Sequence, residues 1–170
     1  MRVVTCDAGP IIHLYEAGFL SLLKNVGEIL LPQKVSVEVL AVTDLADHRP
    51  EWLRVIWLSS SELKEARMWA KTGDLHAGEA DAFVLARMQK ADWLLTADWL
   101  LTDDSSARLF ASLFGLEVHG SLGVVLWNAA RGYLSKKDAE QALSNLKKSS
   151  LWLSAKIFAE AQKALMDMDR

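Results

Sequence analysis

The chain has 170 residues, 51% of them hydrophobic and 24% charged, with a formal net charge of −3 and a single cysteine, Cys6. This length suits one domain with a core of its own, and the slightly acidic balance argues against a strongly basic protein that coats nucleic acid. Because it has no bilayer-length apolar run, no signal-peptide pattern and no paired cysteines, we expect a soluble, cytoplasmic protein without a disulfide framework or a cysteine zinc site.

The first ten residues hold a short apolar run that ends at an acid. Val3–Cys6 predicts a strand buried on both faces, and Pro10 favours a helix over residues 10–17. Asp7 therefore stands where a strand passes into a helix, and this edge of an open parallel α/β sheet is where ligands and catalytic groups collect. Taken alone, Asp7 is explained more simply as the cap of the helix.

Strands and helices continue to alternate, and one of the helices carries an acid. Helical spacing places Glu38 between Val35 and Val42, opposite Ser36 and Leu40. A carboxylate in an apolar stripe is costly unless a charged or hydrogen-bonding group meets it, so a structural salt bridge and a functional role are both open. In this part of the chain we predict helices at 19–25, 34–42 and 61–71, strands at 28–31 and 54–58, and a polar loop at 43–50.

The stretch over residues 75–90 is the clearest helix, and it carries two acids. Asp81 lies at the centre of the apolar face around Val84 and Leu85, so it is predicted to be buried. Glu79 points nearly to the opposite side. It can still reach a site through the first turn, or it can simply interact favourably with the helix dipole.

The hexapeptide ADWLLT occurs twice in succession, at 91–96 and 97–102. One strand suffices here, and only the second copy leads into a helix, which begins near Asp103 and Asp104 and ends at Gly115. We therefore assign the strand to the end of the second copy, and we expect the first copy to extend the preceding helix or to form a loop.

The rest of the chain is predicted to be mainly helical. Ser60 or Ser61 is expected to cap the helix at 61–71, and Ser135 with Asp138 forms a capping box. No linker divides the chain, which we interpret as one domain over residues 1–170 whose C-terminal helices, from about 135, cover the core or a partner. The remaining elements are a strand at 116–119, a turn at 120–123, and helices that end near 132 and run over 135–148 and 154–168. The apolar side chains that the last helices expose are Leu151, Trp152, Leu153 and Phe158.

This alternation predicts a three-layer α/β/α domain with a mainly parallel central sheet. Asp7 and Asp104 then follow two strands at the same edge, while Glu38 and Asp81 lie on helices that pack on the sheet. If the four carboxylates converge, each like-charge neighbour costs on the order of 1 to 4 kcal/mol. Hard divalent cations remove this penalty, so the acids predict a site for Mg²⁺ or Mn²⁺.

Acid-bound Mg²⁺ or Mn²⁺ is the usual equipment for hydrolysing phosphodiester bonds. Patterns for a serine nucleophile or a phosphate-binding P-loop do not occur in the sequence. The four histidines lack the spacing of metal ligands, which favours oxygen ligands over a zinc site. They are His13, His48, His76 and His119.

Five motifs occur in a fixed order along the chain: DAGPIIHL, VSVEVL, GEADAFVLA, LLTDDSSAR, and GSLGVVL followed by Gly132. Their order and spacing resemble a PIN-domain protein, close to the ribonuclease toxins of VapC type, over nearly the whole chain up to about residue 147. The resemblance implies a metal-dependent endoribonuclease that acts on RNA. The catalytic, metal-binding acids that it implies are Asp7, Glu38, Asp81 and Asp104, with Glu79 and Asp103 as auxiliary groups.

The same resemblance implies partners as well as a site. PIN-domain proteins of this type usually form homodimers, and the toxins among them are held inactive by a small antitoxin protein. The family's last acid follows a threonine by two residues, which fits Thr102 and Asp104. Thr96 and Asp98 satisfy the same spacing, but the SSARLF continuation favours Asp104.

Two other functions are compatible with these acids. A Mg²⁺-dependent phosphatase of another acid-rich α/β fold would also place Asp7 at a strand end, but enzymes with an aspartyl nucleophile generally need a second Asp where this chain has Gly9. A PIN-like domain without activity would serve as a binding module. Candidate phosphate contacts around the site are the basic residues Arg87, Lys90, Arg108 and Arg131.

Overall fold

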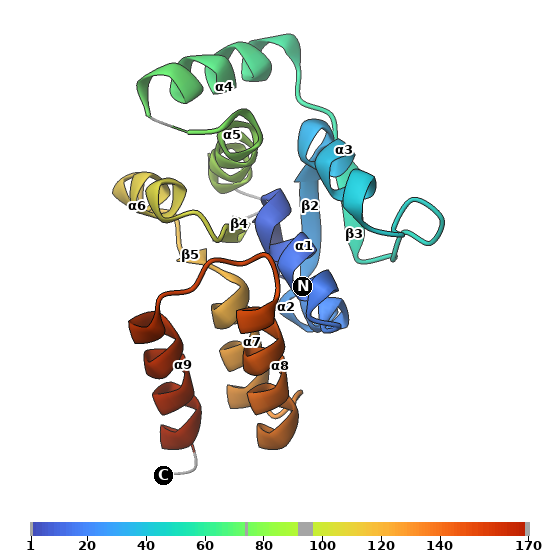
Figure 1. The fold of residues 1–170 in the computed structure, drawn as a ribbon. Helices are drawn as coiled ribbons and strands as arrows, with labels where there is room; N and C mark the ends of the chain where they lie inside the picture. The colour runs from blue at the N-terminus through green and yellow to red at the C-terminus, as the bar shows by residue number, and fades with distance from the viewer. Residues whose placement is uncertain (1, 74, 92–96, 169–170) are drawn as a thin grey trace.

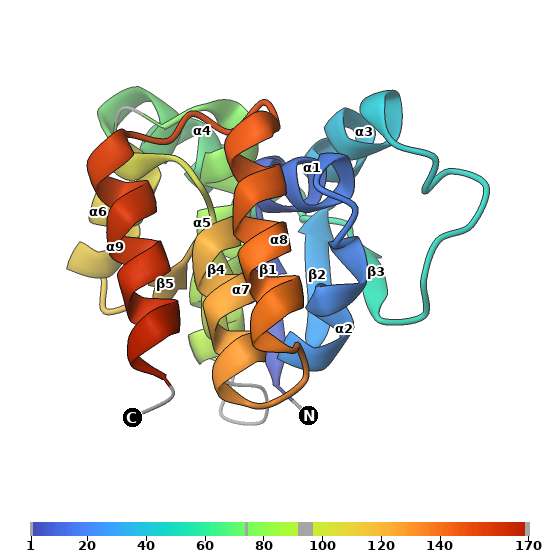
Figure 2. The same cartoon turned by 60° about the horizontal axis from the view of Figure 1, so that its bottom comes forward.

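The computed structural model describes residues 2–73, 75–91 and 97–168. Its centre is a parallel sheet of five strands in the order β3-β2-β1-β4-β5 (Figures 1 and 2). The strands are β1 (Val3–Cys6), β2 (Glu28–Pro32), β3 (Leu53–Ile56), β4 (Ala97–Leu101) and β5 (Val118–His119). β1 lies in the middle of the sheet beside β4, so the residues that follow these two strands are neighbours at one edge.

The helices start and end close to the predicted positions. Their bounds are α1 (Ala8–Glu16), the 3₁₀ turn η1 (Leu20–Leu22), α2 (Leu23–Val26), α3 (Gln33–Val42), α4 (Ser60–Thr72), α5 (Ala77–Ala91), α6 (Ser105–Leu113), α7 (Ser121–Ala130), α8 (Lys136–Lys148) and α9 (Ala155–Asp167). The cap of α4 is Ser59, not Ser60 or Ser61, because Ser59 and Glu62 form a reciprocal capping box. Each helix in these residues is too short or too polar to span a lipid bilayer.

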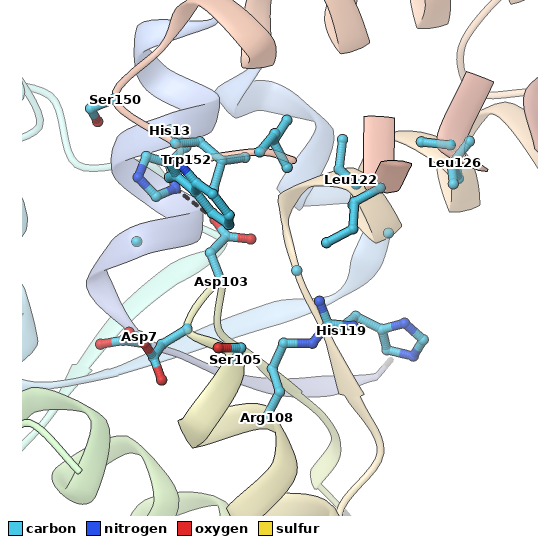
Figure 3. Close-up of a pocket in the computed structure, with 18 of the residues that line it drawn as sticks. Asp7, His13, Asp103, Ser105, Arg108, His119, Leu122, Leu126, Ser150 and Trp152 are labelled. Carbon is cyan, nitrogen blue, oxygen red and sulfur yellow. Dashed lines mark hydrogen bonds and ion pairs between the residues drawn. The ribbon is translucent and has the colours of Figure 1, made fainter. Parts of the chain in front are cut away.

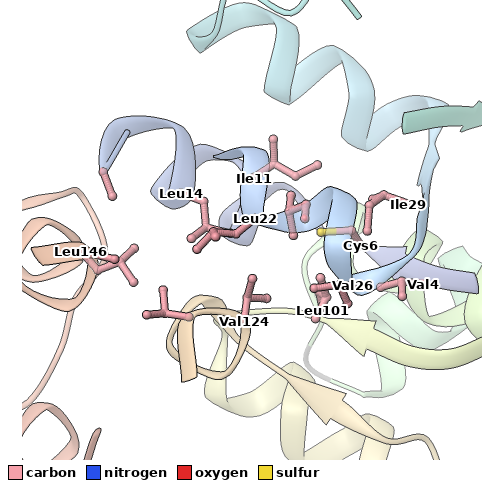
Figure 4. Packing of buried hydrophobic residues seen from close by; sticks show 14 of the residues in the cluster. Val4, Cys6, Ile11, Leu14, Leu22, Val26, Ile29, Leu101, Val124 and Leu146 are labelled. Atoms are coloured by element: carbon pink, nitrogen blue, oxygen red, sulfur yellow. The ribbon is translucent and has the colours of Figure 1, made fainter. Parts of the chain in front are cut away.

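Side chains of the strands alternate between the two faces of the sheet, and each face has its own core. Val4 and Cys6 of β1 contribute to a large cluster with Ile11 of α1 and Val124 of α7 (Figure 4). Leu100 of β4 belongs to a second cluster, which is formed with α4, α5 and α6. Helices thus cover both faces, which confirms the predicted three-layer fold.

The two C-terminal helices pack on the first of these cores, to which α8 contributes Leu146. Of the four apolar side chains expected to be exposed, Trp152 is exposed, Leu153 and Phe158 are half-buried against this core, and Leu151 is buried. Leu151 was misplaced because no periodicity governs the loop between α8 and α9, where a single side chain can turn inward.

The tandem repeat is divided between two elements. The second copy forms β4 as predicted, although the strand begins at Ala97, earlier than expected. A bulge between Val3 and Val4 lets β1 pair with this longer strand. Of the first copy, Ala91 ends α5, and residues 92–96 lie outside the described residues.

Thr5 introduces a polar group into the buried centre of the sheet. Within the described chain, its hydroxyl is the buried side-chain atom without a hydrogen-bond partner. Because an unpaired buried hydroxyl is unfavourable, we expect Thr5→Val to raise the free energy of unfolding by about 1 kcal/mol, measured by urea denaturation. The control is Thr5→Ser, which keeps the hydroxyl and should not stabilise. A destabilised valine variant would contradict this interpretation.

Candidate active site

Asp7 directly follows β1 and occupies the N-cap position of α1. Its side chain forms no N-cap hydrogen bond, so capping does not explain the residue. The backbone N–H of Asp7 donates to the Leu101 carbonyl at 2.9 Å, and the Thr102 hydroxyl donates to Asp7 Oδ2 at 3.4 Å. The side chain is therefore held at the junction of β1 and β4, and it is 8% exposed.

The electrostatics around Asp7 favour a cation. Burial raises the pKa of Asp7 to about 6, and the nearby carboxylates of Glu79 and Glu38 add to this rise. Hydrogen bonds from the Ala8 N–H and the Thr102 hydroxyl oppose it without cancelling it. A bound cation would stabilise this buried carboxylate more than the two hydrogen bonds from Ala8 and Thr102 do.

A cleft of about 700 Å³ opens over this edge of the sheet (Figure 3). Five acids line it, from four separate stretches of the chain: Asp7, Glu79, Asp103, Asp104 and Glu160. Its other walls come from the start of α7, from the loop between α8 and α9, and from α9 itself. The structure thus brings together two of the four acids assigned as catalytic and both of the auxiliary ones.

Asp103 fixes the elements around the cleft to one another. His13 of α1 lies with Nδ1 at 2.6 Å from Asp103 Oδ2, and the backbone N–H of Ser121 donates to Oδ1 at 2.6 Å. The Ser121 hydroxyl also donates to Oδ2. A Cβ at Gly120 would lie 2.5 Å from Asp103 Oδ1, so this close approach requires glycine. Both oxygens of Asp103 are thus occupied, and the residue positions α1 and α7 around the site.

Asp104 combines a structural role with its place in the cleft. Its Oδ1 accepts a hydrogen bond from the Ala107 N–H at 2.8 Å, which caps α6. The backbone N–H of Asp104 donates to the Thr102 hydroxyl at 3.3 Å, and that hydroxyl in turn donates to Asp7. Thr102 therefore links the two acids that follow adjacent strands.

Glu79 enters the cleft from the first turn of α5. Its Oε2 accepts a hydrogen bond from the His76 N–H at 2.8 Å, so the side chain folds back towards the start of the helix. Burial raises the pKa of Glu79, the His76 hydrogen bond lowers it, and Asp104 and Glu38 raise it further. The helical wheel placed Glu79 away from the site because it describes where a side chain leaves the helix, not where a long carboxylate ends.

Glu38 lies on an exposed part of α3, so the prediction that it sits in an apolar stripe is wrong. The buried residues of α3 are Val35, Ser36 and Val39, while Val42 is exposed. Ser36 tolerates burial because its hydroxyl donates to the Gln33 carbonyl at 2.7 Å.

The Glu38 carboxylate nevertheless faces the start of α5. A Cβ at Gly78 would lie 3.1 Å from Glu38 Oε1, so the glycine leaves room for this side chain. The charge of Glu38 also raises the pKa of Asp7, Glu79 and Asp81, so it acts on acids of both clefts.

Asp81 is buried as predicted, but the structure places it in a different cleft from Asp7. This second cleft of about 250 Å³ lies between α3, α4 and α5 and is also lined by Lys34 and Arg67. Burial raises the pKa of Asp81, Lys34 and Arg67 lower it, and Glu38 raises it. Asp81 therefore shares its cleft with two basic side chains that partly offset the effect of burial.

The donor set at the first cleft fits a hard divalent cation, because carboxylate oxygens are the ligands that Mg²⁺ and Mn²⁺ prefer. Among residues 2–73, 75–91 and 97–168, no three Asp, Glu, His or Cys side chains stand close enough together to coordinate one ion. Mutual repulsion between carboxylates opposes such an arrangement, and repulsion from Glu79 and Glu38 adds to the rise that burial causes in the pKa of Asp7.

One of the predicted basic residues belongs to this cleft. Arg108 of α6 lines it (Figure 3). Arg87 instead pairs with Glu65 and lies over the ring of Trp69, and Arg131 lies over the ring of Trp127. The side chain of Lys90 lies outside what the structure describes.

Sequence reasoning missed residues at and beside the cleft, among them His13 and Trp152, which line it, and Ser121, which donates to Asp103. His13 lies on α1 and Ser121 begins α7. Both contact Asp103 only because the order of the strands brings these helices next to the residue that follows β4. Trp152 was predicted to be exposed, but its position at the cleft follows from the packing of α8 and α9, which no local pattern encodes.

Comparison with known proteins agrees with this geometry. A family model described as PIN domain matches residues 3–167. No curated protein matches the chain. The PIN domain is a nuclease fold, and proteins that carry it are generally hydrolases of nucleic acids. With this match over nearly its whole length, the chain belongs to the PIN-domain family.

Proposed function

We propose that this protein is a metal-dependent endoribonuclease that hydrolyses RNA phosphodiester bonds. One observation carries the proposal: a buried carboxylate, Asp7, lies in an acid-lined cleft at the edge of the parallel sheet, with its pKa raised to about 6 by burial and neighbouring acids. Such a site is unfavourable until a cation occupies it, and this supports metal binding as its purpose.

The resemblance and the geometry together suggest a role for each acid. We propose that Asp7, Glu38 and Asp104 hold Mg²⁺ or Mn²⁺, and that Glu79, which shares the cleft, stands with them more closely than Asp81. The bound metal supplies a water of lowered pKa and stabilises the leaving oxygen. Arg108, on the same cleft, is placed to meet a phosphate of the RNA.

We also propose that this protein binds a second copy of itself and a small antitoxin protein. The resemblance to VapC-type toxins suggests a homodimer and a small antitoxin protein as partner. Exposed apolar side chains on α3 and α6 offer surfaces for such contacts, among them Val37, Leu109 and Leu113.

The test is cleavage of a labelled pool of single-stranded and hairpin RNAs in Mg²⁺, Mn²⁺ or EDTA. Water attack on phosphorus with departure of the 3′ oxygen predicts fragments with 5′-phosphate and 3′-hydroxyl ends, formed only with metal. Fragments with 2′,3′-cyclic phosphate ends, or equal cleavage in EDTA, would overturn the proposed mechanism. Absence of cleavage in every condition would favour the inactive binding module.

A further inference from the structure

Trp152 is a large aromatic side chain left in solvent. It is 82% exposed, and it lies on the loop between α8 and α9. The same residue lines the cleft that contains Asp7 (Figure 3). Trp57 is also largely exposed, at 73%, but it lies between β3 and α4 and is not among the described residues that line this cleft. An exposed indole at the acid-lined cleft is therefore placed to contact a ligand of that cleft, whereas Trp57 is not.

The loop that carries Trp152 is held on both sides of it. The backbone N–H and the hydroxyl of Ser150 both donate to Glu16 Oε2 at 2.7 Å. Leu151 is buried, and its N–H donates to the Ser149 hydroxyl at 3.2 Å. After the tryptophan, Ser154 caps α9. These contacts fix the backbone on either side of the ring, so little conformational entropy is lost when a ligand packs on it.

Two chemically different kinds of side chain line the cleft. The acids and Arg108 are charged, whereas Trp152, Leu122, Leu126 and Ile157 are apolar. In the view of Figure 3, Asp103 lies between the Trp152 ring and Asp7. A nucleotide has the matching pair of features, a charged phosphate and a flat base whose faces are apolar.

We propose that Trp152 is a stacking platform for an unpaired base of the RNA substrate, adjacent to the phosphate that meets the acids. This inference rests on the proposed nuclease function and adds to it a residue that positions the substrate by stacking on an unpaired base. A base within a duplex has both faces covered by its neighbours, so a duplex cannot use the platform. Stacking on an aromatic ring is tolerant of sequence, so any base is accepted there.

The experiment measures RNA binding in the Asp7→Asn background, where the bound RNA is not expected to be cleaved. A fluorescein-labelled single-stranded RNA and a fully paired duplex without a loop are titrated by anisotropy. Loss of one base stack is worth about 1 to 3 kcal/mol, so Trp152→Ala should weaken single-strand binding about 5- to 150-fold. Trp152→Phe should retain most of the affinity, and Trp57→Ala is the matched control that should not change it.

Abasic substitutions locate the stacked base. Single abasic nucleotides are placed in turn along the RNA, and each RNA is titrated with the Trp152 protein and with Trp152→Ala. At one position, the Trp152 protein should bind the abasic RNA more weakly than the intact RNA. The Trp152→Ala variant should bind these two RNAs with equal affinity. Equal affinity of Trp152→Ala and Trp152 proteins for the intact single strand would overturn the proposal, and would leave a protein partner as the ligand of this ring.

The stacking proposal and the nuclease proposal fail in different ways. If binding depends on Trp152 but no RNA is cleaved with metal, the stacking platform stands and the nuclease function fails. If RNA is cleaved with metal but the abasic series shows no position that depends on Trp152, the nuclease function stands and the platform fails.

Discussion

The Asp7→Asn variant is expected to lose RNA cleavage and, above pH 6, to be more stable than the wild-type protein in the absence of metal. Loss of groups that only support metal ligands typically costs 10- to 100-fold, so loss of a ligand itself should lower cleavage by at least about 100-fold. Asparagine keeps the shape of the side chain but removes the buried charge. A site that reduces stability when it is empty is typical of residues selected for function.

The stability difference should follow the titration of Asp7. Its pKa is raised to about 6 in the folded protein from its ordinary value of 3.8, so the folded state holds the proton more tightly than the unfolded chain. Wild-type stability therefore falls as pH rises from about 4 to about 6 and is constant above, with a total change of roughly 3 kcal/mol. Asp7→Asn lacks this contribution.

Urea denaturation in EDTA at a series of pH values measures the difference. The variant and the wild-type protein should have similar stability near pH 4 and diverge up to about pH 6. Mg²⁺ or Mn²⁺ should then raise the melting temperature of the wild-type protein but not of the variant, since binding to the folded state alone stabilises it. A variant that is less stable than the wild-type protein at pH 8 would contradict the burial of an uncompensated charge.

The second large effect concerns the two acids of α5. Glu79→Gln is expected to lower metal-dependent cleavage by at least about 100-fold, whereas Asp81→Asn should lower it less than tenfold. The reason is position: Glu79 shares a cleft with Asp7, whereas Asp81 lies in another one with Lys34 and Arg67. Initial rates of RNA cleavage across a range of Mn²⁺ concentrations separate weaker metal binding from slower chemistry.

The two substitutions control for each other. Both replace a half- or fully buried acid of α5 with its amide, so effects on the helix as a whole should be similar. If Asp81→Asn abolishes cleavage while Glu79→Gln does not, the metal-binding role belongs to Asp81, as the motif order implies, and the side chains must rearrange when the metal binds.

The fold follows from the sequence because its signals are local. The apolar run Val3–Cys6, the caps Ser135 and Ser154, and the position of the second ADWLLT copy each determine one element. Once strands alternate with helices, the parallel sheet is the expected arrangement. β1 and β4 are adjacent in the structure, and this brings Asp7 and Asp104 together.

The positions of Glu38 and Glu79 were less accessible to sequence reasoning. The buried face of α3 includes Ser36, whose hydroxyl is satisfied within its own helix, so hydrophobicity alone selects the wrong face. At the start of α5, the His76 N–H draws the Glu79 carboxylate back around the first turn. Both errors arise where a polar side chain is satisfied by a nearby backbone group, which is a contact that residue periodicity does not represent.

The cleft is assembled from widely separated parts of the chain: the residue after β1, the start of α5, the stretch from Asp103 to Arg108, and the wall formed by Trp152 and α9. A protein is synthesised from its N-terminus, and a ribosome releases these parts in that order. Asp7 is thus synthesised early, whereas the wall that includes Ala161 is synthesised late. A nascent chain therefore lacks a complete cleft, so the site is not yet assembled while the ribosome is still reading the messenger RNA that encodes it.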